Sequence, residues 1–120
     1  MTKLKTFTAF LLLLLLISCS NEKEALLLGN WQGISWIIEG ADSGRNADSV
    51  KFTFEDTGSY KGSWGDKTEV GVFDLQGDKL YTTEEGKLKK MVKINQIGTD
   101  TLVMLMNRVG TDEKLILVRK

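Results

Sequence analysis

The sequence predicts an all-β fold, an eight-stranded antiparallel up-and-down barrel preceded by a short N-terminal helical segment. Two observations lead to this prediction. Turn signals rich in Gly and Asp recur about every nine to thirteen residues, which is the rhythm of short antiparallel strands. Between the turns, apolar and polar side chains alternate, and the segments lack helical spacing.

The turn signals divide the chain after residue 28 into eight extended segments. Gly adopts positive φ angles at low cost, and Asp and Asn bond to their own backbone in turns. The turns are expected at 40–44, 56–58, 65–66, 76–78, 85–86, 98–100 and 110–112. The strands are expected at 29–39, 49–55, 59–64, 67–75, 79–83, 88–97, 101–108 and 113–119.

Alternation within the segments favours a closed sheet. Val50, Phe52 and Phe54 share one face of their segment, with polar residues opposite. A flat sheet of this kind would expose two edges and an apolar face, and closure into a barrel removes both problems. A barrel of about eight strands is filled by its own side chains or holds one small ligand. A two-layer sandwich is the alternative fold.

The first 18 residues predict a signal peptide. Lys3 and Lys5 form a basic start, and the apolar stretch at 7–17 is shorter than the roughly twenty residues that a membrane span needs. The segment LISC at 16–19 resembles the bacterial lipobox, and it holds the only cysteine, Cys19. The resemblance implies cleavage before Cys19 and lipidation of that residue. An uncleaved anchor helix and an ordinary signal peptide with a leftover thiol are the alternatives.

The expected organisation is a lipoprotein signal peptide at 1–18, a lipidated tether at 19–27 and a barrel domain at 28–120. The tether contains good helix formers at 22–27, which favour one or two helical turns. Two or more acyl chains hold a protein firmly at a membrane. The lipobox resemblance therefore implies a lipid-anchored protein of the bacterial cell envelope. It also implies the outer membrane, because Ser20 rather than Asp follows the cysteine.

The composition argues against several classes of function. The chain has 16 basic and 16 acidic residues, and the only charged residues that loss of the signal peptide would remove are Lys3 and Lys5. Because the chain has no excess of positive charge, we expect no nucleic-acid partner. The chain has no histidine, no second thiol, no phosphate-binding loop and no cluster with metal-ligand spacing. We therefore expect no enzymatic activity, no catalytic residues, no metal and no cofactor.

Short motifs occur in a fixed order along the barrel domain. They are LGNW at 28–31, F-x-x-x-G-x-Y at 54–60, GVF-x-L-x-GD-x-L at 71–80, TDTLV at 99–103 and L-x-LVR at 115–119. Together they resemble the lipocalins, and more closely the short lipocalin-like lipoproteins of Bacteroidota. The resemblance implies that Trp31 packs at the closed end of the barrel beneath Arg119. The strands are shorter than those of long lipocalins, which implies a shallower cup.

The candidate ligand-binding residues are small or aromatic side chains on the expected strands. They are Gly33, Ser35, Trp36, Phe52, Phe54, Tyr60, Trp64, Phe73 and Tyr81. Aromatic side chains of this kind line apolar pockets, and they equally fill the core of a small domain. Gly33 and Ser35 alternate with Trp31, so they leave room in the lumen or mark a bend in the strand.

Two functions fit these observations. The first is a carrier that binds a small apolar or amphipathic molecule inside the barrel. The second is a solid barrel with a structural or protein-interaction role, including inhibition of a hydrolase. The segments 101–108 and 113–119 are apolar on both faces, so their outer faces need a cover. Residues 21–28 or another envelope protein would supply that cover.

Overall fold

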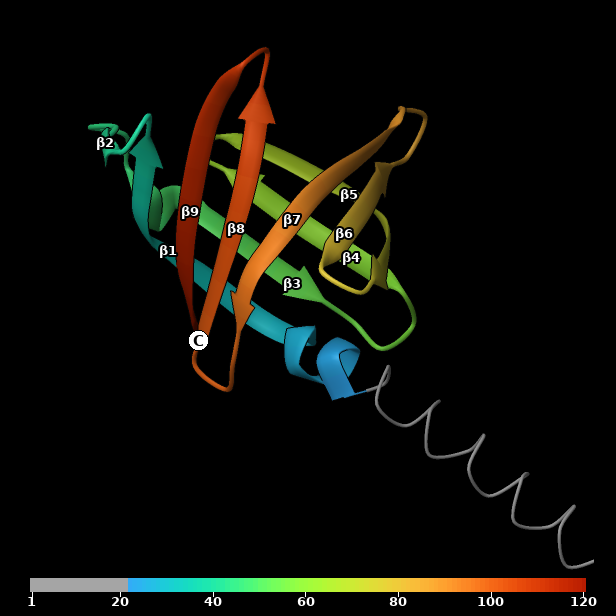
Figure 1. The fold of residues 1–120 in the computed structure, drawn as a ribbon. Helices are drawn as coiled ribbons and strands as arrows, with labels where there is room; N and C mark the ends of the chain where they lie inside the picture. The colour runs from blue at the N-terminus through green and yellow to red at the C-terminus, as the bar shows by residue number, and fades with distance from the viewer. Residues whose placement is uncertain (1–21) are drawn as a thin grey trace, which may run out of the picture.

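Antiparallel strands wind around one axis and close into a barrel in the computed structural model, which describes residues 22–120 (Figure 1). The predictions for residues 1–18 and for Cys19 lie outside the described residues. A short helix covers residues 22–27. The other elements are β1 (Gly29–Ile38), β2 (Ala41–Asp42), the 3-10 helix η1 (Ala47–Ser49), β3 (Val50–Phe54), β4 (Ser59–Trp64), β5 (Lys67–Gln76), β6 (Lys79–Glu84), β7 (Lys89–Ile97), β8 (Thr101–Arg108) and β9 (Thr111–Arg119).

Pairing between the first and last long strands closes the sheet. Neighbours along the chain pair from β3 to β9, and β1 pairs with β3 on one side and with β9 on the other. Eight strands therefore form the barrel, which confirms the predicted fold and excludes the sandwich. The two-residue strand β2 pairs only with the end of β1 and is not one of the strands of the closed barrel. Neither β2 nor η1 was predicted, because two or three residues carry no readable period.

Alternating side chains along each strand face the interior. On β3, for example, Val50, Phe52 and Phe54 are buried, while Lys51 is exposed. A cluster of buried apolar residues from β1, β3 to β9, η1 and the N-terminal helix forms the core. A pattern of period two along antiparallel strands thus gives the barrel an apolar interior, while some large apolar groups, such as Val70 and Val72 of β5, remain on the outer face.

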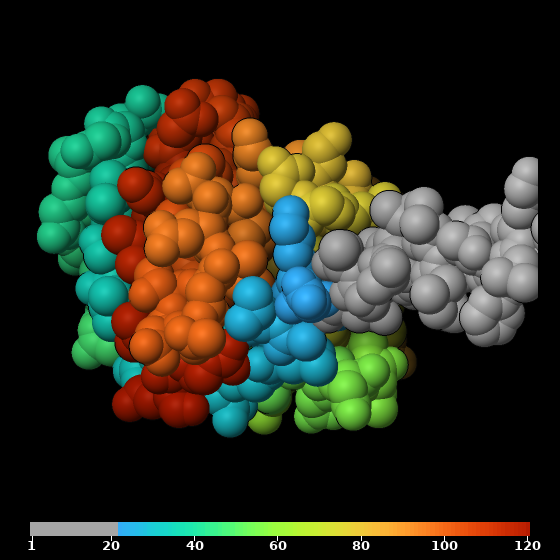
Figure 2. Space-filling view, turned by 60° about the horizontal axis from the view of Figure 1, so that its bottom comes forward, coloured from blue at the N-terminus to red at the C-terminus, as the bar shows by residue number. Residues whose placement is uncertain are grey.

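The two ends of the barrel differ. β1 starts and β9 stops at one end, which also carries the turns after β3, β5 and β7, and we call it the closed end. Leu27 of the N-terminal helix is fully buried there within the core cluster. Figure 2 shows the helical segment in blue against this end, beside orange and red segments of the last strands. The opposite end carries the turns after β4, β6 and β8, and we call it the open end.

A β-bulge in β1 corrects one prediction. The register with β9 shifts between Gly33 and Ser35, so Trp31 and Gly33 face inward, and beyond the bulge Trp36 faces inward instead of Ser35. A bulge adds one residue to a strand and moves every later side chain to the other face. Of the two interpretations of Gly33 and Ser35, the bend in the strand is confirmed, and the position of Ser35 in the lumen is wrong.

The outer faces of β8 and β9 are covered only in part. Val103 is buried outside the core cluster, while Leu105, Ile116 and Val118 are half-buried. Because Leu27 enters the core at the closed end, the helical segment does not form a layer over these faces.

Within residues 22–120, no helix is long and apolar enough to cross a membrane.

Candidate ligand-binding cavity

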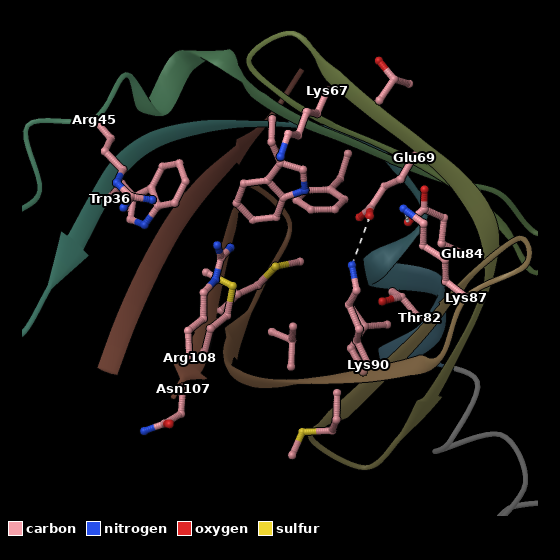
Figure 3. Close-up of a pocket in the computed structure, with 18 of the residues that line it drawn as sticks. Trp36, Arg45, Lys67, Glu69, Thr82, Glu84, Lys87, Lys90, Asn107 and Arg108 are labelled. Carbon is pink, nitrogen blue, oxygen red and sulfur yellow. Dashed lines mark hydrogen bonds and ion pairs between the residues drawn. The ribbon is translucent and has the colours of Figure 1, made fainter. Parts of the chain in front are cut away.

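The open end leads into a cavity of about 940 Å³ (Figure 3). Side chains from the loop after β1 and from all of the long strands except β9 line it. Its volume falls within the range of about 300–1,000 Å³ that is typical of small-molecule sites. The interior side chains of the barrel therefore do not fill it completely.

One side of the cavity is an apolar surface that we call the aromatic wall. It consists of Trp36, Phe52, Trp64, Met104 and Met106. Trp64 packs edge-on against both Trp36 and Phe52, with ring centroids 5.4 Å apart in each pair. These edge-to-face contacts fix the rings in place, because the positive edge of one ring meets the negative face of the next. Met side chains adapt to the shape of a ligand more readily than branched side chains do.

The aromatic column continues below the cavity into the core. Phe52 stacks on Phe54, whose ring lies 5.1 Å from that of Phe73 and 6.3 Å from that of Tyr60. Phe54, Tyr60 and Phe73 are buried and do not line the cavity. The predicted aromatic set therefore divides between a cavity wall and a solid core beneath it.

The opposite side of the cavity is polar, and we call it the polar wall. It consists of Glu69, Thr82, Glu84, Lys87 and Lys90. Lys90 pairs with Glu69 at 3.4 Å and Lys87 pairs with Glu84 at 3.2 Å. Both lysines are more than half exposed, so water screens these pairs. The cavity thus offers a ligand one apolar side and one hydrogen-bonding side.

Tyr60 lies behind the polar wall. Burial raises the pKa of its phenol above the ordinary value, and the nearby carboxylates of Glu69 and Glu84 add to this rise. A hydrogen bond from the Thr82 hydroxyl opposes the rise and lowers the pKa of the phenol. The phenol therefore stays neutral at physiological pH.

A buried carboxylate connects the aromatic wall to the rim. Glu113 is only 5% exposed, and its Oε1 accepts a hydrogen bond of 2.9 Å from the indole Nε1 of Trp36. Its Oε2 lies 3.0 Å from Nε of Arg108. A buried charge is costly unless it is paired and hydrogen-bonded, and here it has both kinds of partner. Glu113 therefore positions Trp36 and Arg108 relative to each other.

At the closed end, Arg119 holds the barrel and the N-terminal segment together. Its guanidinium lies 4.3 Å from the ring centroid of Trp31, and Nε donates to the carbonyl of Thr99 at 2.6 Å. Nη1 and Nη2 donate to the carbonyls of Leu28 and Leu26, each at 2.6 Å. The indole of Trp31 in turn donates to the carbonyl of Leu27 at 2.8 Å. These contacts tie the first strand, the last strand and the helix into one unit.

The structure brings only part of the predicted ligand-binding set to the cavity. Trp36, Phe52 and Trp64 line it. Ser35 faces outward after the bulge, and Tyr81 lies between the inward-facing Leu80 and Thr82, so its ring points outward beneath Lys89. Gly33 faces inward but touches η1: a Cβ there would lie 2.2 Å from the carbonyl oxygen of Ala47. Gly33 thus permits close packing and does not enlarge the lumen.

The charged residues at the cavity were not predicted from the sequence. They include Glu113, Arg108, Lys67, Glu69 and Glu84, most of which lie near hairpin turns at the open end. Charged residues beside turns are usually solvated, so their positions alone gave no signal. Glu69 shares the inward face of β5 with Phe73, and Glu84 shares the inward face of β6 with Leu80, so alternation along these strands could have revealed these two residues.

Within residues 22–120, no group of His, Cys, Asp and Glu side chains could hold a metal ion.

Comparison with known proteins agrees with the barrel fold. The model of the lipocalin-like domain family matches residues 27–104, from the buried leucine of the helix to the middle of β8. The chain belongs to this lipocalin-like family. The family match includes the strands that supply most of the cavity wall. A separate search of curated proteins finds no match.

Solved structures share the fold of this lipocalin-like domain. A lipocalin-like protein from Bacteroides uniformis superposes with a TM-score of 0.61 at 19% identity, over 79% of this chain and 99% of the other. An uncharacterized protein from Bacteroides eggerthii superposes with the same TM-score of 0.61 at 14% identity, over 78% of this chain and 98% of the other. At these identities the likeness concerns the fold alone.

Proposed function

We propose that this lipocalin-like protein is anchored by a lipid in the bacterial cell envelope and binds a small apolar or amphipathic molecule in its cavity. The observation that carries the proposal is the cavity of about 940 Å³ with its aromatic wall. Apolar surface that leaves water on binding contributes about 25 cal/mol per Å². A ligand that covers Trp36, Phe52 and Trp64 would therefore gain most of its affinity from that wall.

Fluorescence of N-phenylnaphthylamine, an uncharged apolar probe, tests the binding function. Val92 lines the cavity, whereas Val72 is 58% exposed and lies in a shallower groove on the outer face. We expect Val92→Trp to weaken probe binding at least about tenfold by filling the cavity. The matched control Val72→Trp should leave the Kd within about twofold. Loss of binding in Val72→Trp instead would place the probe in the outer groove and contradict the proposal.

Native mass spectrometry addresses the natural ligand. The domain 20–120 would be isolated gently from its own host. An added mass of a few hundred daltons that leaves on denaturation would support the carrier function.

The second candidate is a protein-interaction lipoprotein. The observation in its favour is the outer face of β1 and β9, where Ile34 is 58% exposed and Ile116 is half-buried. A dimer without added mass would favour this second candidate.

The lipid anchor needs its own test, because it rests on the lipobox resemblance. Metabolic labelling with a clickable fatty acid should label the wild-type protein and fail to label Cys19→Ala. The control Ser20→Ala keeps the thiol and should be labelled as strongly as the wild type. Normal labelling of Cys19→Ala would rule out the anchor while leaving the binding proposal intact.

A further inference from the structure

The mouth of the cavity carries an excess of positive charge. The lining includes the cationic residues Arg45, Lys67, Lys87, Lys90 and Arg108 and the anionic residues Asp66, Glu69 and Glu84. The buried carboxylate of Glu113, which pairs with Arg108 behind the lining, adds a fourth negative charge, so the local excess is one positive charge. The whole chain, in contrast, has equal numbers of basic and acidic residues. A concave site with low-dielectric walls concentrates such a field and attracts anions.

The positive charge is concentrated on the side of the aromatic wall. On the polar wall, Glu69 and Glu84 each have a lysine partner. Near the aromatic wall, Arg45 and Lys67 form no ion pair with any group in residues 22–120. The guanidinium of Arg45 lies 5.0 Å from the ring centroid of Trp36, and this contact leaves its N–H donors free in the plane of the group.

Arg108 completes the cluster from β8. Its guanidinium lies 5.4 Å from the ring centroid of Trp64, and its Nε is held by the buried carboxylate of Glu113. Within the described chain, its two terminal nitrogens donate no hydrogen bond. Figure 3 shows the side chains of Arg108 and Lys67 approaching the cavity from different strands. Glu113 therefore fixes the orientation of a group whose outer donors have no protein acceptor.

We propose that the bound molecule is an amphipathic anion, whose carboxylate, phosphate or sulfonate group lies among Arg45, Lys67 and Arg108. Its apolar body would lie against Phe52 and the two methionines of the aromatic wall. A planar guanidinium binds such oxyanions through two parallel N–H donors, and the ammonium of Lys67 adds a compact charge. This inference rests on the proposed function, since it assigns a chemical class to the ligand of the same cavity.

A pair of fluorescent probes tests the inference. Anilinonaphthalene sulfonate and N-phenylnaphthylamine share one ring skeleton and differ in the sulfonate. The wild-type protein should bind the sulfonate probe at least about tenfold more tightly, as one or two charged hydrogen bonds would produce. Equal affinity for the two probes would overturn the inference and leave the proposed function standing. Failure of both probes to bind would overturn both.

Variants then locate the anion. Arg45 and Lys67 are exposed, so Arg45→Gln with Lys67→Gln should fold normally. We expect this double variant to weaken the sulfonate probe about tenfold and the uncharged probe by less than about twofold. The control Lys51→Gln removes one exposed positive charge from the outer face of β3 and should change neither affinity. A loss that is equal for both probes would contradict the anion site.

Arg108 requires a balanced change, because its loss alone leaves the buried Glu113 without its cation. The paired variant Arg108→Gln with Glu113→Gln leaves the net charge of the site unchanged, and it should weaken binding of the sulfonate probe selectively.

Competition against the uncharged probe identifies the head group. Dodecanoate or dodecyl phosphate should displace the uncharged probe more strongly than dodecanol does. Whichever of the two anions competes more strongly shows whether a carboxylate or a phosphate fits the site. Equal displacement by dodecanol would overturn the inference.

Discussion

The two ends of the barrel use the same pair of residue types, tryptophan and arginine, for opposite purposes. At the closed end, Arg119 lies over Trp31, and all three of its nitrogens donate to backbone carbonyls. At the open end, Arg108 lies over Trp64, and within residues 22–120 only its Nε has a protein partner. An arginine–tryptophan contact therefore stabilises the fold where backbone carbonyls use its donors, and offers a binding group where the donors remain available.

The strongest test of this comparison removes one tryptophan from each end. Trp31 is 1% exposed and hydrogen-bonded, so Trp31→Ala should lower the free energy of unfolding by about 3–5 kcal/mol. Trp64 is half-buried at the cavity, so Trp64→Ala should cost less than about 2 kcal/mol and weaken N-phenylnaphthylamine binding instead. Urea unfolding followed by circular dichroism measures both. A loss below about 1 kcal/mol in Trp31→Ala would contradict the assigned role of the closed end.

Replacement of each arginine by lysine gives the next largest difference. Lysine keeps the charge but cannot reach the three carbonyls of Thr99, Leu28 and Leu26 at once, so Arg119→Lys should lower the free energy of unfolding by about 2–3 kcal/mol. Arg108→Lys keeps a cation near Glu113, and it should cost less than about 1 kcal/mol. Equal losses from the two variants in urea unfolding would remove the distinction between the ends.

A smaller effect concerns Tyr60, which lies between the two ends. Its phenol pKa is raised in the folded protein, so the folded state favours the neutral form. Its contribution to stability is present below the unfolded pKa of about 10 and is lost as pH rises through the folded pKa. Tyr60→Phe should cost about 1 kcal/mol at pH 7 and make the loss of stability above pH 10 less steep. Thermal unfolding at several pH values measures this, with Tyr81→Phe, at a partly exposed outer tyrosine, as the control.

The smallest effect belongs to the ion pairs of the polar wall. Lys87 is 64% exposed in its pair with Glu84, so Lys87→Ala should change the free energy of unfolding by less than about 0.5 kcal/mol. Differential scanning calorimetry with and without added salt measures the change. A loss greater than about 1 kcal/mol would mean that this wall also stabilises the fold, and would blur the comparison between the ends.

Much of the fold could be predicted because strand periodicity and turn chemistry are local. The turn at Gly77-Asp78 and the alternation of Val50, Phe52 and Phe54 each leave a signal within a few residues. The eight predicted strands therefore match β1 and β3 to β9 closely. At Gly33 and Ser35 the sequence left two interpretations open, room in the lumen or a bend in the strand, because small residues are compatible with both. Only the pairing of β1 with β9 shows that the strand contains a bulge.

The candidate site was less predictable, because it depends on residues that meet only after closure. Glu113 lies 77 positions from Trp36 in the chain, and nothing near either residue predicts their hydrogen bond. Tyr81 was included with the other aromatic residues although its neighbours Leu80 and Thr82 face the interior. The residue type indicated an aromatic site, but the strand face decided which rings reach it.

With the proposed lipid on Cys19, the position of the N-terminal helix would set the direction in which the cavity faces. Cys19 precedes the helix at 22–27 by three residues, and an extended chain of that length reaches about 10 Å. A lipid on Cys19 would thus hold the closed end against the membrane surface, since Leu27 is buried there. The mouth would then open toward the aqueous compartment, so cargo would be exchanged with soluble or facing partners and not extracted from the bilayer underneath.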